Sequence, residues 1–286
     1  MSFGEMDITK YLLRIGFNHP TEPTLEVLRS LHSFHLLAVP FENLTLHCGG
    51  RLSPDLHAVY DKIVNQRRGG LCYENNGLFS WLLSKLGFEV TILSGQVKNA
   101  ITGCYGPPFD HLISMVSLKG RRWLCDVGFG SAGFSVPLSL DAWGEPQTTG
   151  QRVYRVREEG DQRFLEWRGE PGQVTDGEWK GIYKFTLEPR MRDNFTAMCD
   201  YHQSSPSSIF FCKSVCTLLK PDGRLTLVGS TLTTTTFRTD ESAFKTSGRT
   251  LTDEEIPVVL VKMFGVVLPS PLITKDEDVL PPSVEY

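Results

Sequence analysis

The chain has 286 residues, of which 40% are hydrophobic and 22% charged, and its formal net charge is −4. These values are close to the averages of folded proteins, so they exclude a largely disordered or fibrous chain. The charge balance offers no broad basic surface, which argues against nucleic acid as a partner. A chain of this length usually divides its core, so we expect two or three packed subdomains.

Neither end of the sequence shows a targeting or lipidation signal. The start lacks the charged and apolar regions of a signal peptide, and Ser2 stands where myristoylation requires glycine. The longest apolar stretch, 256–268, is too short to span a bilayer and contains Lys262. The seven cysteines have no framework spacing, which favours reduced thiols. We therefore expect a cytoplasmic protein that does not contact a membrane.

The first 87 residues are predicted to be helical. Asp7 is a helix cap before the periodic run 8–15, and a second run, 25–39, stops at Pro40. Ser53-Pro54 opens a third helix, which ends in the arginine and glycine pairs of 67–70. A fourth helix begins at Cys72, and its apolar residues keep helical spacing up to Gly87.

From residue 88 the hydrophobic period changes to two, which predicts strands. The predicted strands are 88–96, 111–118, 122–127, 152–158, 163–167, 180–187, 209–219 and 224–230. Two further helices are predicted at 192–203 and at 253–264, the second opened by a capping box of Thr252 and Glu255. Regularly spaced strands favour a small barrel. The predicted fold class is α+β, with a helical bundle in 1–87, a central β-barrel in 88–190 and an α/β segment in 191–286.

Cys72 is a candidate nucleophile because it stands at the first turn of a predicted helix. The positive end of the helix dipole and the free N–H groups there favour a thiolate. The preceding Gly69 and Gly70 allow a tight backbone turn and the close approach of a substrate. The alternative is a buried cysteine after a helix-capping glycine pair, since free cysteine is among the most buried residue types.

A turn at Lys119-Gly120 would place Asp126 opposite Ile113 and diagonal to His111 on the same face of the sheet. Their backbones would then be about 7 Å apart, within reach of the two side chains. A cysteine, a histidine and an aspartate in this relation are a nucleophile, its base and the group that orients the base. The alternative is a half-buried histidine–aspartate pair that has no connection with Cys72.

A metal site is a rival prediction, since Cys199, His202, Cys212 and Cys216 form a C-x2-H and C-x3-C pattern. Two cysteines four residues apart on a strand would be about 13 Å apart, too far to share a zinc ion. We therefore expect no metal and interpret the cysteines other than Cys72 as core or surface thiols. The remaining histidines are interpreted as surface or cap residues: His19, His32, His35, His47 and His57.

Four motifs resemble those of the arylamine N-acetyltransferase family. They are V-P-F-E-N-L at 39–44, R-G-G-L-C-Y-E-N-N at 68–76, His111, and D-V-G-F-G at 126–130. The likeness continues through 185–190 and 201–208 to the last helix, so it covers nearly the whole chain. The resemblance implies a catalytic triad of Cys72, His111 and Asp126 on a core related to papain-like cysteine enzymes, with the C-terminal segment as a lid.

The resemblance also implies roles for residues around the triad. It pairs Glu42 with Arg68 to hold the active-site loop, and Asn76 matches the asparagine that follows the nucleophile. The segment 201–208 resembles the coenzyme A-contacting lid, in which we select Tyr201, Ser207 and Ser208. An ordinary Ser-Pro turn is the alternative. Three further residues are candidates for the acceptor pocket, or are ordinary core: Phe41, Val97 and Phe129.

The function implied is acetyl transfer from acetyl-CoA to arylamines or arylhydrazines, and to the oxygen of N-arylhydroxylamines, through an acetyl-cysteine. A papain-like hydrolase or transglutaminase, and a silent relative that only binds its ligands, are the rivals. We expect a monomer. The segment between Trp167 and Ile182 is shorter than in mammalian members, and 129–133 combines an aromatic with very small residues. The preferred arylamine therefore does not follow from any one relative.

Overall fold

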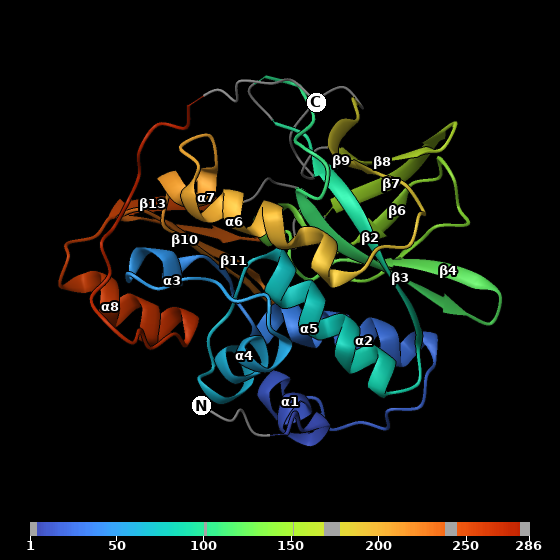
Figure 1. Cartoon of the computed structure of the whole chain (residues 1–286), viewed down its shortest axis with the longest axis horizontal. Coiled ribbons are helices and arrows are strands. Elements are labelled where there is room, and N and C mark those ends of the chain that lie inside the picture. The colour runs from blue at the N-terminus through green and yellow to red at the C-terminus, as the bar shows by residue number, and fades with distance from the viewer. Residues whose placement is uncertain (1–4, 100–101, 151, 169–177, 238–244, 281–286) are drawn as a thin grey trace.

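The computed structural model describes residues 5–99, 102–150, 152–168, 178–237 and 245–280 (Figure 1). Its helices are α1 (Ile8–Ile15), α2 (Leu25–Ala38), α3 (Leu44–His47), α4 (Leu56–Tyr60), α5 (Cys72–Lys85), α6 (Thr196–Ser204), α7 (Ile209–Cys212) and α8 (Glu255–Val259). Single π-helical turns, Asp61–Asn65 and Leu260–Phe264, continue α4 and α8, and 3-10 turns lie at Gly130–Ala132 and Arg192–Phe195. Among the described residues no helix has the length and apolar character needed to cross a membrane.

The helix ends follow local signals in the sequence. Asp7 accepts the N–H of Thr9 at 2.7 Å, and Gly16, at a φ of 73°, closes α1. The predicted starts of α2 and α5 are confirmed as well. The helix predicted to open at Ser53-Pro54 is α4, and it begins later than predicted. Its N-cap is Asp55, which accepts the N–H of Ala58, while Ser53 accepts the N–H of Asp55. A carboxylate within reach of free N–H groups outcompetes the Ser-Pro signal.

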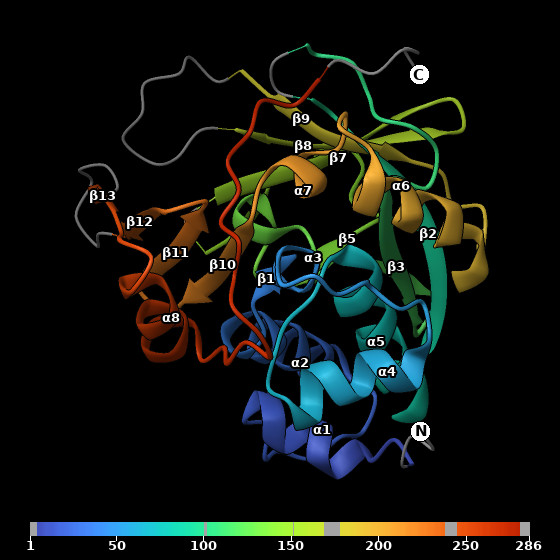
Figure 2. The ribbon, with the colours of Figure 1, turned by 60° about the vertical axis from the view of Figure 1, so that its left-hand side comes forward.

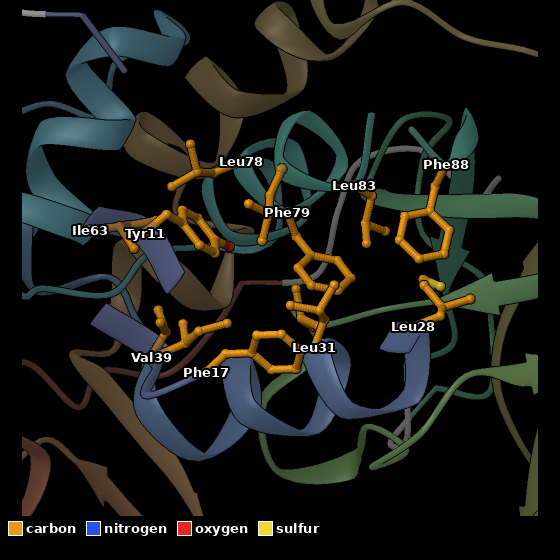
Figure 3. Close-up of a cluster of buried hydrophobic side chains, with 14 of the residues drawn as sticks. Tyr11, Phe17, Leu28, Leu31, Val39, Ile63, Leu78, Phe79, Leu83 and Phe88 are labelled. Carbon is orange, nitrogen blue, oxygen red and sulfur yellow. The ribbon is translucent and has the colours of Figure 1, made fainter. Parts of the chain in front are cut away.

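Helices α1, α2 and α5 pack around a shared hydrophobic core (Figure 3). Leu78, Phe79, Leu82 and Leu83 on α5 are fully buried, which confirms the apolar stripe predicted for this helix. From α2 the same core receives Leu28 and Leu31. Burial of this stripe fixes the direction of α5 and so places its first residue, Cys72, at the opposite end from Gly87.

Eight antiparallel strands form a sheet in the order β5-β4-β3-β2-β9-β8-β7-β6. They are β2 (Glu89–Val97), β3 (His111–Leu118), β4 (Arg121–Cys125), β5 (Leu138–Ser139), β6 (Gln147–Thr149), β7 (Arg152–Glu159), β8 (Gln162–Arg168) and β9 (Lys180–Phe185). The register predicted for β3 and β4 is confirmed, since Leu118 pairs with Arg121 and Ser114 with Cys125. The segment predicted to be short lies mostly in 169–177, outside the described residues.

The sheet is nearly closed into a barrel, and one side chain joins its two edge strands. Gln147 on β6 accepts the N–H of Ser139 on β5 at 2.7 Å, and its amide donates to the Ser139 carbonyl at 2.9 Å. The side-chain amide therefore replaces a backbone pairing across the seam. The barrel-like architecture predicted from strand spacing is correct, although β5 and β6 themselves were not predicted.

A second antiparallel sheet has the order β1-β10-β11-β12-β13. Its strands are β1 (Phe41–Glu42), β10 (Val215–Lys220), β11 (Gly223–Val228), β12 (Thr231–Thr236) and β13 (Lys245–Thr250). The two views in Figures 1 and 2 show this sheet on one side of the molecule and the barrel on the other. Because β1 pairs with β10, residues 41–42 join the C-terminal sheet. The division at residues 87 and 190 stays a prediction.

One prediction for the C-terminal part is wrong, and one strand was not predicted. The β-branched threonines of residues 231–236 form the strand that was not predicted, β12, which pairs with β11 and β13. The strand predicted over 209–219 begins only at Val215, because Ile209–Cys212 forms α7, with Ser208 as its N-cap. The Ser208 hydroxyl accepts the N–H of Phe210 at 3.2 Å and so starts a helical turn. The capping box of Thr252 and Glu255 is confirmed.

Candidate active site

Three elements bring Cys72, His111 and Asp126 together. Cys72 is the first residue of α5, His111 is the first residue of β3, and Asp126 directly follows β4. All three are buried, with relative exposures of 3%, 3% and 1%. The hairpin of β3 and β4 therefore presents its histidine and its aspartate to the N-terminal end of α5.

His111 lies between the aspartate and the thiol. Its Nε2 is 2.8 Å from Oδ2 of Asp126, and a hydrogen bond with Cys72 contributes to its electrostatic environment. Since Nε2 is engaged with the carboxylate, Nδ1 is the ring nitrogen left to exchange a proton with Cys72. This orientation suits a base whose tautomer is fixed by a carboxylate.

Asp126 is held by several donors besides His111. The side-chain amide of Asn76 donates to Asp126 at 2.8 Å and to the Leu112 carbonyl at 2.6 Å, and its oxygen accepts the N–H of Val127 at 2.7 Å. The N–H of Gly128 donates to the same carboxylate at 3.0 Å. Asn76 therefore ties α5, β3 and the segment after β4 to one another.

The charges in this group shift one another's ionisation. Burial lowers the pKa of His111, but the charge and hydrogen bond of Asp126, with a smaller contribution from Cys72, raise that pKa to about 10. Burial raises the pKa of Asp126, yet His111, Asn76 and the Gly128 N–H together hold it below its usual value. At neutral pH the imidazolium–carboxylate pair is therefore the favoured state.

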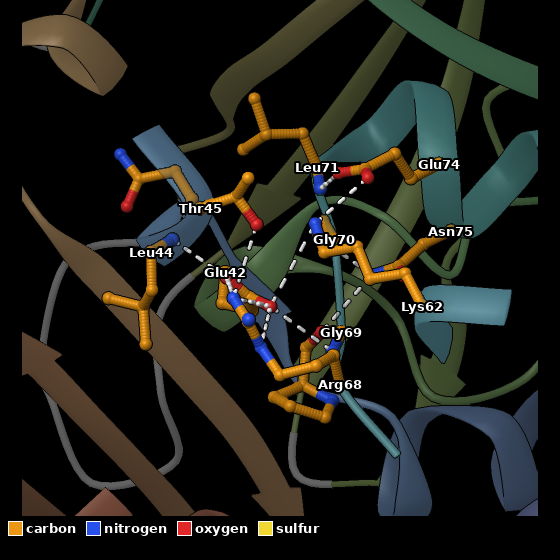
Figure 4. Close-up of polar contacts among 12 residues, drawn as sticks. Glu42, Leu44, Thr45, Lys62, Arg68, Gly69, Gly70, Leu71, Glu74 and Asn75 are labelled. Carbon is orange, nitrogen blue, oxygen red and sulfur yellow. Dashed lines mark hydrogen bonds and ion pairs between the residues drawn. The ribbon is translucent and has the colours of Figure 1, made fainter. Parts of the chain in front are cut away.

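A second buried charge cluster contacts the loop 68–71, which directly precedes Cys72 (Figure 4). The ion pair predicted between Glu42 and Arg68 is present, with their closest atoms 2.9 Å apart. Lys62, on the π-helical turn after α4, is 2.8 Å from Glu74 and 3.9 Å from Glu42. The sequence analysis did not identify Lys62 or Glu74, because nothing in the local pattern shows that their charges meet.

Both carboxylates of this cluster also bind backbone N–H groups of the loop and its neighbours. Glu74 accepts the N–H of Leu71 at 3.0 Å, and Glu42 accepts those of Gly69 at 3.3 Å and Leu44 at 2.7 Å. Removing one partner of such a buried cluster typically costs about 3–5 kcal/mol, because an uncompensated charge remains. The cluster therefore fixes the loop that precedes Cys72.

Close contacts within the protein require the two glycines before Cys72. A Cβ on Gly69 would lie 1.9 Å from the Pro40 carbonyl oxygen, and one on Gly70 would lie 2.6 Å from Cβ of Glu74. Neither glycine has a positive φ. The close approach that the structure shows is that of the protein's own backbone and of Glu74.

Gly128 was not identified from the sequence, although it lies in the D-V-G-F-G motif. A Cβ there would be 2.7 Å from Cα of Cys72 and 2.8 Å from the amide nitrogen of Asn76. Such distances are far inside van der Waals contact. Gly128 thus lets the Asp126 segment pack directly against the first turn of α5.

The interpretation of His32, His35 and His47 as surface or cap residues is wrong, since all three are buried. His32 accepts the backbone N–H of Asp126 at 3.2 Å and contacts the Ser135 carbonyl, and burial lowers its pKa to about 4. It therefore supports Asp126 as a neutral ring. The signal was available: His32 and His35 share the buried face of α2 with Leu28 and Leu31. His19 and His57 are exposed, as predicted.

Aromatic rings surround the imidazole. Phe129 packs edge-on against His111, with ring centroids 5.1 Å apart, and Tyr183 lies 5.3 Å from His111 and 5.4 Å from Phe129. Burial and the charge of Asp126 raise the pKa of Tyr183 well above its usual value. The ring centroids of Phe41 and Phe210 are 5.7 Å apart. The sequence analysis did not identify Tyr183, because its alternating surroundings on β9 indicated a strand and gave no sign of a site.

The acceptor and cofactor candidates differ in their surroundings. Val97 pairs with Tyr183 across β2 and β9. Tyr201 and Ser207 are half-buried on α6 and on the turn that follows. Ser208 is buried, and its hydroxyl is 2.8 Å from Nδ1 of His202. The structure thus groups Phe129 with His111, while it directs the Ser208 hydroxyl inward.

A cavity begins directly after Phe129, at Gly130, Ser131 and Gly133, with about 560 Å³ of empty space that includes open solvent. Arg152 and Arg224 also line it, and both donate to the Ser131 carbonyl. Neither Cys72 nor His111 lines this cavity. It lies between the barrel and the second sheet, beside the small residues noted in 129–133.

The cysteines are all unpaired thiols: Cys48, Cys72, Cys104, Cys125, Cys199, Cys212 and Cys216. Within the described ranges, no three or more His, Cys, Asp or Glu side chains form a group that could hold a metal ion. The prediction that Cys212 and Cys216 lie on one strand is wrong, because Cys212 ends α7 and only Cys216 lies on β10.

Comparison with known proteins gives one consistent result. A family model described as N-acetyltransferase matches residues 24–273. The chain is 37% identical to Mus musculus arylamine N-acetyltransferase 2, and 37% identical to Homo sapiens arylamine N-acetyltransferase 1. Each alignment covers 96% of this chain and 98% of the relative.

Solved structures give the same result. The arylamine N-acetyltransferase from Salmonella typhimurium has a TM-score of 0.81 and 29% identity over 91% of this chain and 90% of that one. The Mycobacterium marinum arylamine N-acetyltransferase in complex with CoA has a TM-score of 0.79 and 32% identity, over 91% of this chain and 93% of that one.

Proposed function

This chain belongs to the arylamine N-acetyltransferase family, and we propose that it works by a ping-pong mechanism in which Cys72 carries the acetyl group. It is an acyltransferase that transfers acetyl groups to arylamines. The observation that carries the mechanism is the contact of His111 with both Asp126 and Cys72 at the start of α5. Acetyl-CoA is the proposed donor, because a related structure holds CoA.

In the first half-reaction the Cys72 thiolate attacks the acetyl carbonyl of acetyl-CoA. The bond between the carbonyl carbon and the coenzyme A sulfur breaks, and the imidazolium of His111 gives its proton to the leaving thiolate. First-turn N–H groups have no partner within a helix, so the N–H of Cys72 is the proposed donor to the oxyanion. The products are acetyl-Cys72, coenzyme A and neutral His111.

In the second half-reaction the arylamine nitrogen attacks acetyl-Cys72. The carbon–sulfur bond to Cys72 breaks, and the proton lost by the nitrogen passes to His111, which restores the thiolate–imidazolium pair. The charge of Cys72 is one cause of the raised pKa of His111. Acetylation removes that charge, so the imidazole is more readily neutral when it has to accept a proton.

Arylamines suit this step because the ring keeps the nitrogen unprotonated, whereas an alkylamine with a pKa of about 10.4 is almost wholly charged at pH 7. The same attack is open to arylhydrazines and to the oxygen of N-arylhydroxylamines. Phe129 and Tyr183 pack around His111 and support an aromatic acceptor site there. We assign Phe41 and Val97 to the same site.

We place the coenzyme A contact on the α6–α7 segment, at Tyr201 and Ser207. Ser208 is the third candidate, but its buried hydroxyl contacts His202 and the N–H of Phe210, so we prefer the half-buried Ser207. The division into bundle (1–87), barrel (88–190) and lid (191–286), the monomeric state and the cytoplasmic location belong to the same proposal. The unpaired cysteines support the location.

Intact-protein mass spectrometry after mixing with acetyl-CoA tests the mechanism. We expect one adduct of about 42 Da on Cys72, the mass of one acetyl group in place of a proton, which an arylamine removes and water removes only slowly. Rapid loss in water would identify a hydrolase. The absence of any adduct on folded protein would identify a silent binder and refute the proposal.

A further inference from the structure

A second histidine lies between an aspartate and a hydroxyl, outside the group that contains Cys72. The Nδ1 of His202 is 2.8 Å from Oγ of Ser208, and its Nε2 is 3.1 Å from Oδ1 of Asp110. The side chains of His202 and Asp110 are 6% and 13% exposed. The Nε2 contact is short but poorly aligned, so it falls short of a full hydrogen bond.

The hydrogen bonds in this array can be ordered from donor to acceptor. The N–H of Phe210 donates to Ser208, so the Ser208 hydroxyl can donate to Nδ1 of His202 and leave a hydrogen on Nε2 that faces the Asp110 carboxylate. The partners of His202 thus indicate that Nε2 carries a hydrogen. Ser208 is buried and caps a helix of four residues, so it has neither the access nor the helix dipole of a nucleophile.

Asp110 connects this array to the catalytic group, because it directly precedes His111. Its Oδ2 accepts the N–H of Val97 at 3.1 Å, and its carbonyl accepts the hydroxyl of Tyr73 at 3.0 Å. Tyr73 directly follows Cys72 and also donates to the Phe109 carbonyl at 3.1 Å. The neighbours of both reacting residues thus contact each other at Asp110.

The backbone at this junction is strained. Phe109 has a φ of 65°, which is unfavourable for a residue with a bulky side chain and persists only when its surroundings hold it. The Ser94 hydroxyl accepts its N–H, and Tyr73 binds its carbonyl. Because the backbone is strained directly before β3, the position of His111 depends on the contacts that hold Asp110.

We propose that His202 is a positioning residue that joins α6 and α7 to Asp110 and so sets the place of His111 relative to Cys72. This inference rests on the proposed function. Besides Asp110 and Ser208, the groups around the His202 ring are the aromatic rings of Tyr73 on α5, Tyr201 on α6 and Phe210 on α7. Among the described residues Asp110 is the charged group that contacts it.

Two substitutions separate the two ends of the array. A glutamine amide can occupy the position of Nε2, so His202→Gln keeps a donor for Asp110 and loses the contact with Ser208. An asparagine amide can occupy the position of Nδ1, so His202→Asn keeps Ser208 and loses Asp110. His35→Gln is the matched control. His35 is also a buried histidine, and its Nδ1 is 2.7 Å from the hydroxyl oxygen of Tyr11, which belongs to neither array.

The first readout is the rate at which iodoacetamide alkylates Cys72 across pH, since it needs no acetyl transfer. We expect His202→Asn to lower this rate about tenfold near neutral pH and to change the pH profile, an effect of the size of one lost polar contact. His202→Gln should stay within about twofold of the unsubstituted protein, and His35→Gln should leave the profile unchanged. Single-turnover acylation by acetyl-CoA should follow the same order.

Equal alkylation profiles for His202→Asn and the unsubstituted protein would overturn the proposal. The proposal would also be overturned if His202→Asn and His35→Gln lost the same alkylation rate in proportion to their lowered melting temperatures, because that result would mean general destabilisation. If His202→Asn does not fold, Asp110→Asn is measured instead, because it keeps an acceptor for Val97 and loses the charge. An unsubstituted protein that forms no acetyl adduct refutes the proposed function alone, because alkylation still reports on His202.

Discussion

The arrays around His111 and His202 contain the same kinds of parts and differ in what holds them. Both histidines present Nε2 to an aspartate, at 2.8 Å for Asp126 and 3.1 Å for Asp110. On the other side of each ring lies a side chain that chemistry can use as a nucleophile, Cys72 or Ser208. Residue types and distances alone would class them together.

Their surroundings separate the two arrays. Cys72 begins a helix of 14 residues, whereas Ser208 caps one of four residues and its oxygen already accepts the N–H of Phe210. Asp126 is fixed by Asn76 and Gly128, and the pKa of His111 is raised to about 10. We therefore expect a long helix and several hydrogen-bond donors to the aspartate to distinguish the proposed reactive group from a structural one.

The largest effect is expected from making the first array resemble the second. Cys72→Ser should abolish acetyl transfer with the fold retained, because a hydroxyl is far harder to ionise than a thiol. Turnover of an arylamine with acetyl-CoA measures this, and circular dichroism checks the fold. Ser208→Cys in that background should not become acetylated. Appreciable turnover by Cys72→Ser would remove Cys72 as the nucleophile.

Replacing the two aspartates compares the arrays directly. Asp126→Asn should lower turnover by about 10⁴-fold, as in serine-protease triads, because an amide can select the wrong imidazole tautomer. Asp110→Asn should lower it by about tenfold, since it acts only through position. Acetyl-CoA affinity, measured by calorimetry, should change little in either variant. Similar losses in both would mean that Asp126 is a structural partner too.

The pH dependence of stability is a third test. His111 has a raised pKa, so its contribution to the free energy of unfolding is full below the unfolded value of about 6.5 and is lost as pH rises through about 10. Asp126 has a lowered pKa, so its contribution is present above its unfolded value of about 3.9 and is lost as pH falls through the folded value.

Urea unfolding at several pH values checks this dependence. The stability difference between the unsubstituted protein and Asp126→Asn should be largest at about pH 4 to 6.5 and should shrink toward pH 10. Ser208→Ala is the comparison, because the substituted side chain does not ionise in this range. A difference for Asp126→Asn that stays constant with pH would contradict the coupling of His111 and Asp126.

The smallest effect is expected at the two serines of the α6–α7 turn. Ser208→Ala removes the cap of α7 and should cost about 1 kcal/mol of stability. Ser207→Ala should raise the acetyl-CoA KM a few-fold, while deacetylation of preloaded enzyme by arylamine keeps its rate. Thermal melts and separate half-reactions distinguish the two. A larger KM change in Ser208→Ala would reverse their assignment.

The sequence predicted best where one local pattern decides the outcome. The stripe of α5 set that helix, and the Lys119-Gly120 turn set the register that brings Asp126 to His111. It failed where long-range partners decide. Phe41–Glu42 becomes a strand only because β10 lies beside it. Lys62 and Glu74, 12 positions apart, meet only after α4 and α5 have packed.

The candidate site was predicted in outline together with Glu42, Arg68 and Asn76, but other residues that support it were not. Gly128 was missed because the reason for a glycine there, the backbone of Cys72 at 2.7 Å from its missing Cβ, is a tertiary contact. His32 was missed because histidine was weighed by type, although helical spacing put it on a buried face. His202 was considered only as a metal ligand, and its partners come from Asp110 and Ser208.

The seam at Gln147 has a consequence for the behaviour of the protein at high concentration. The barrel's edge strands are only two and three residues long, and the Gln147 amide occupies the free backbone groups of Ser139. An unpaired edge can recruit a strand from another molecule and seed aggregation. We therefore expect the Gln147 amide to limit aggregation through this edge. Its loss should first be visible as turbidity on storage, while acetyl transfer is retained.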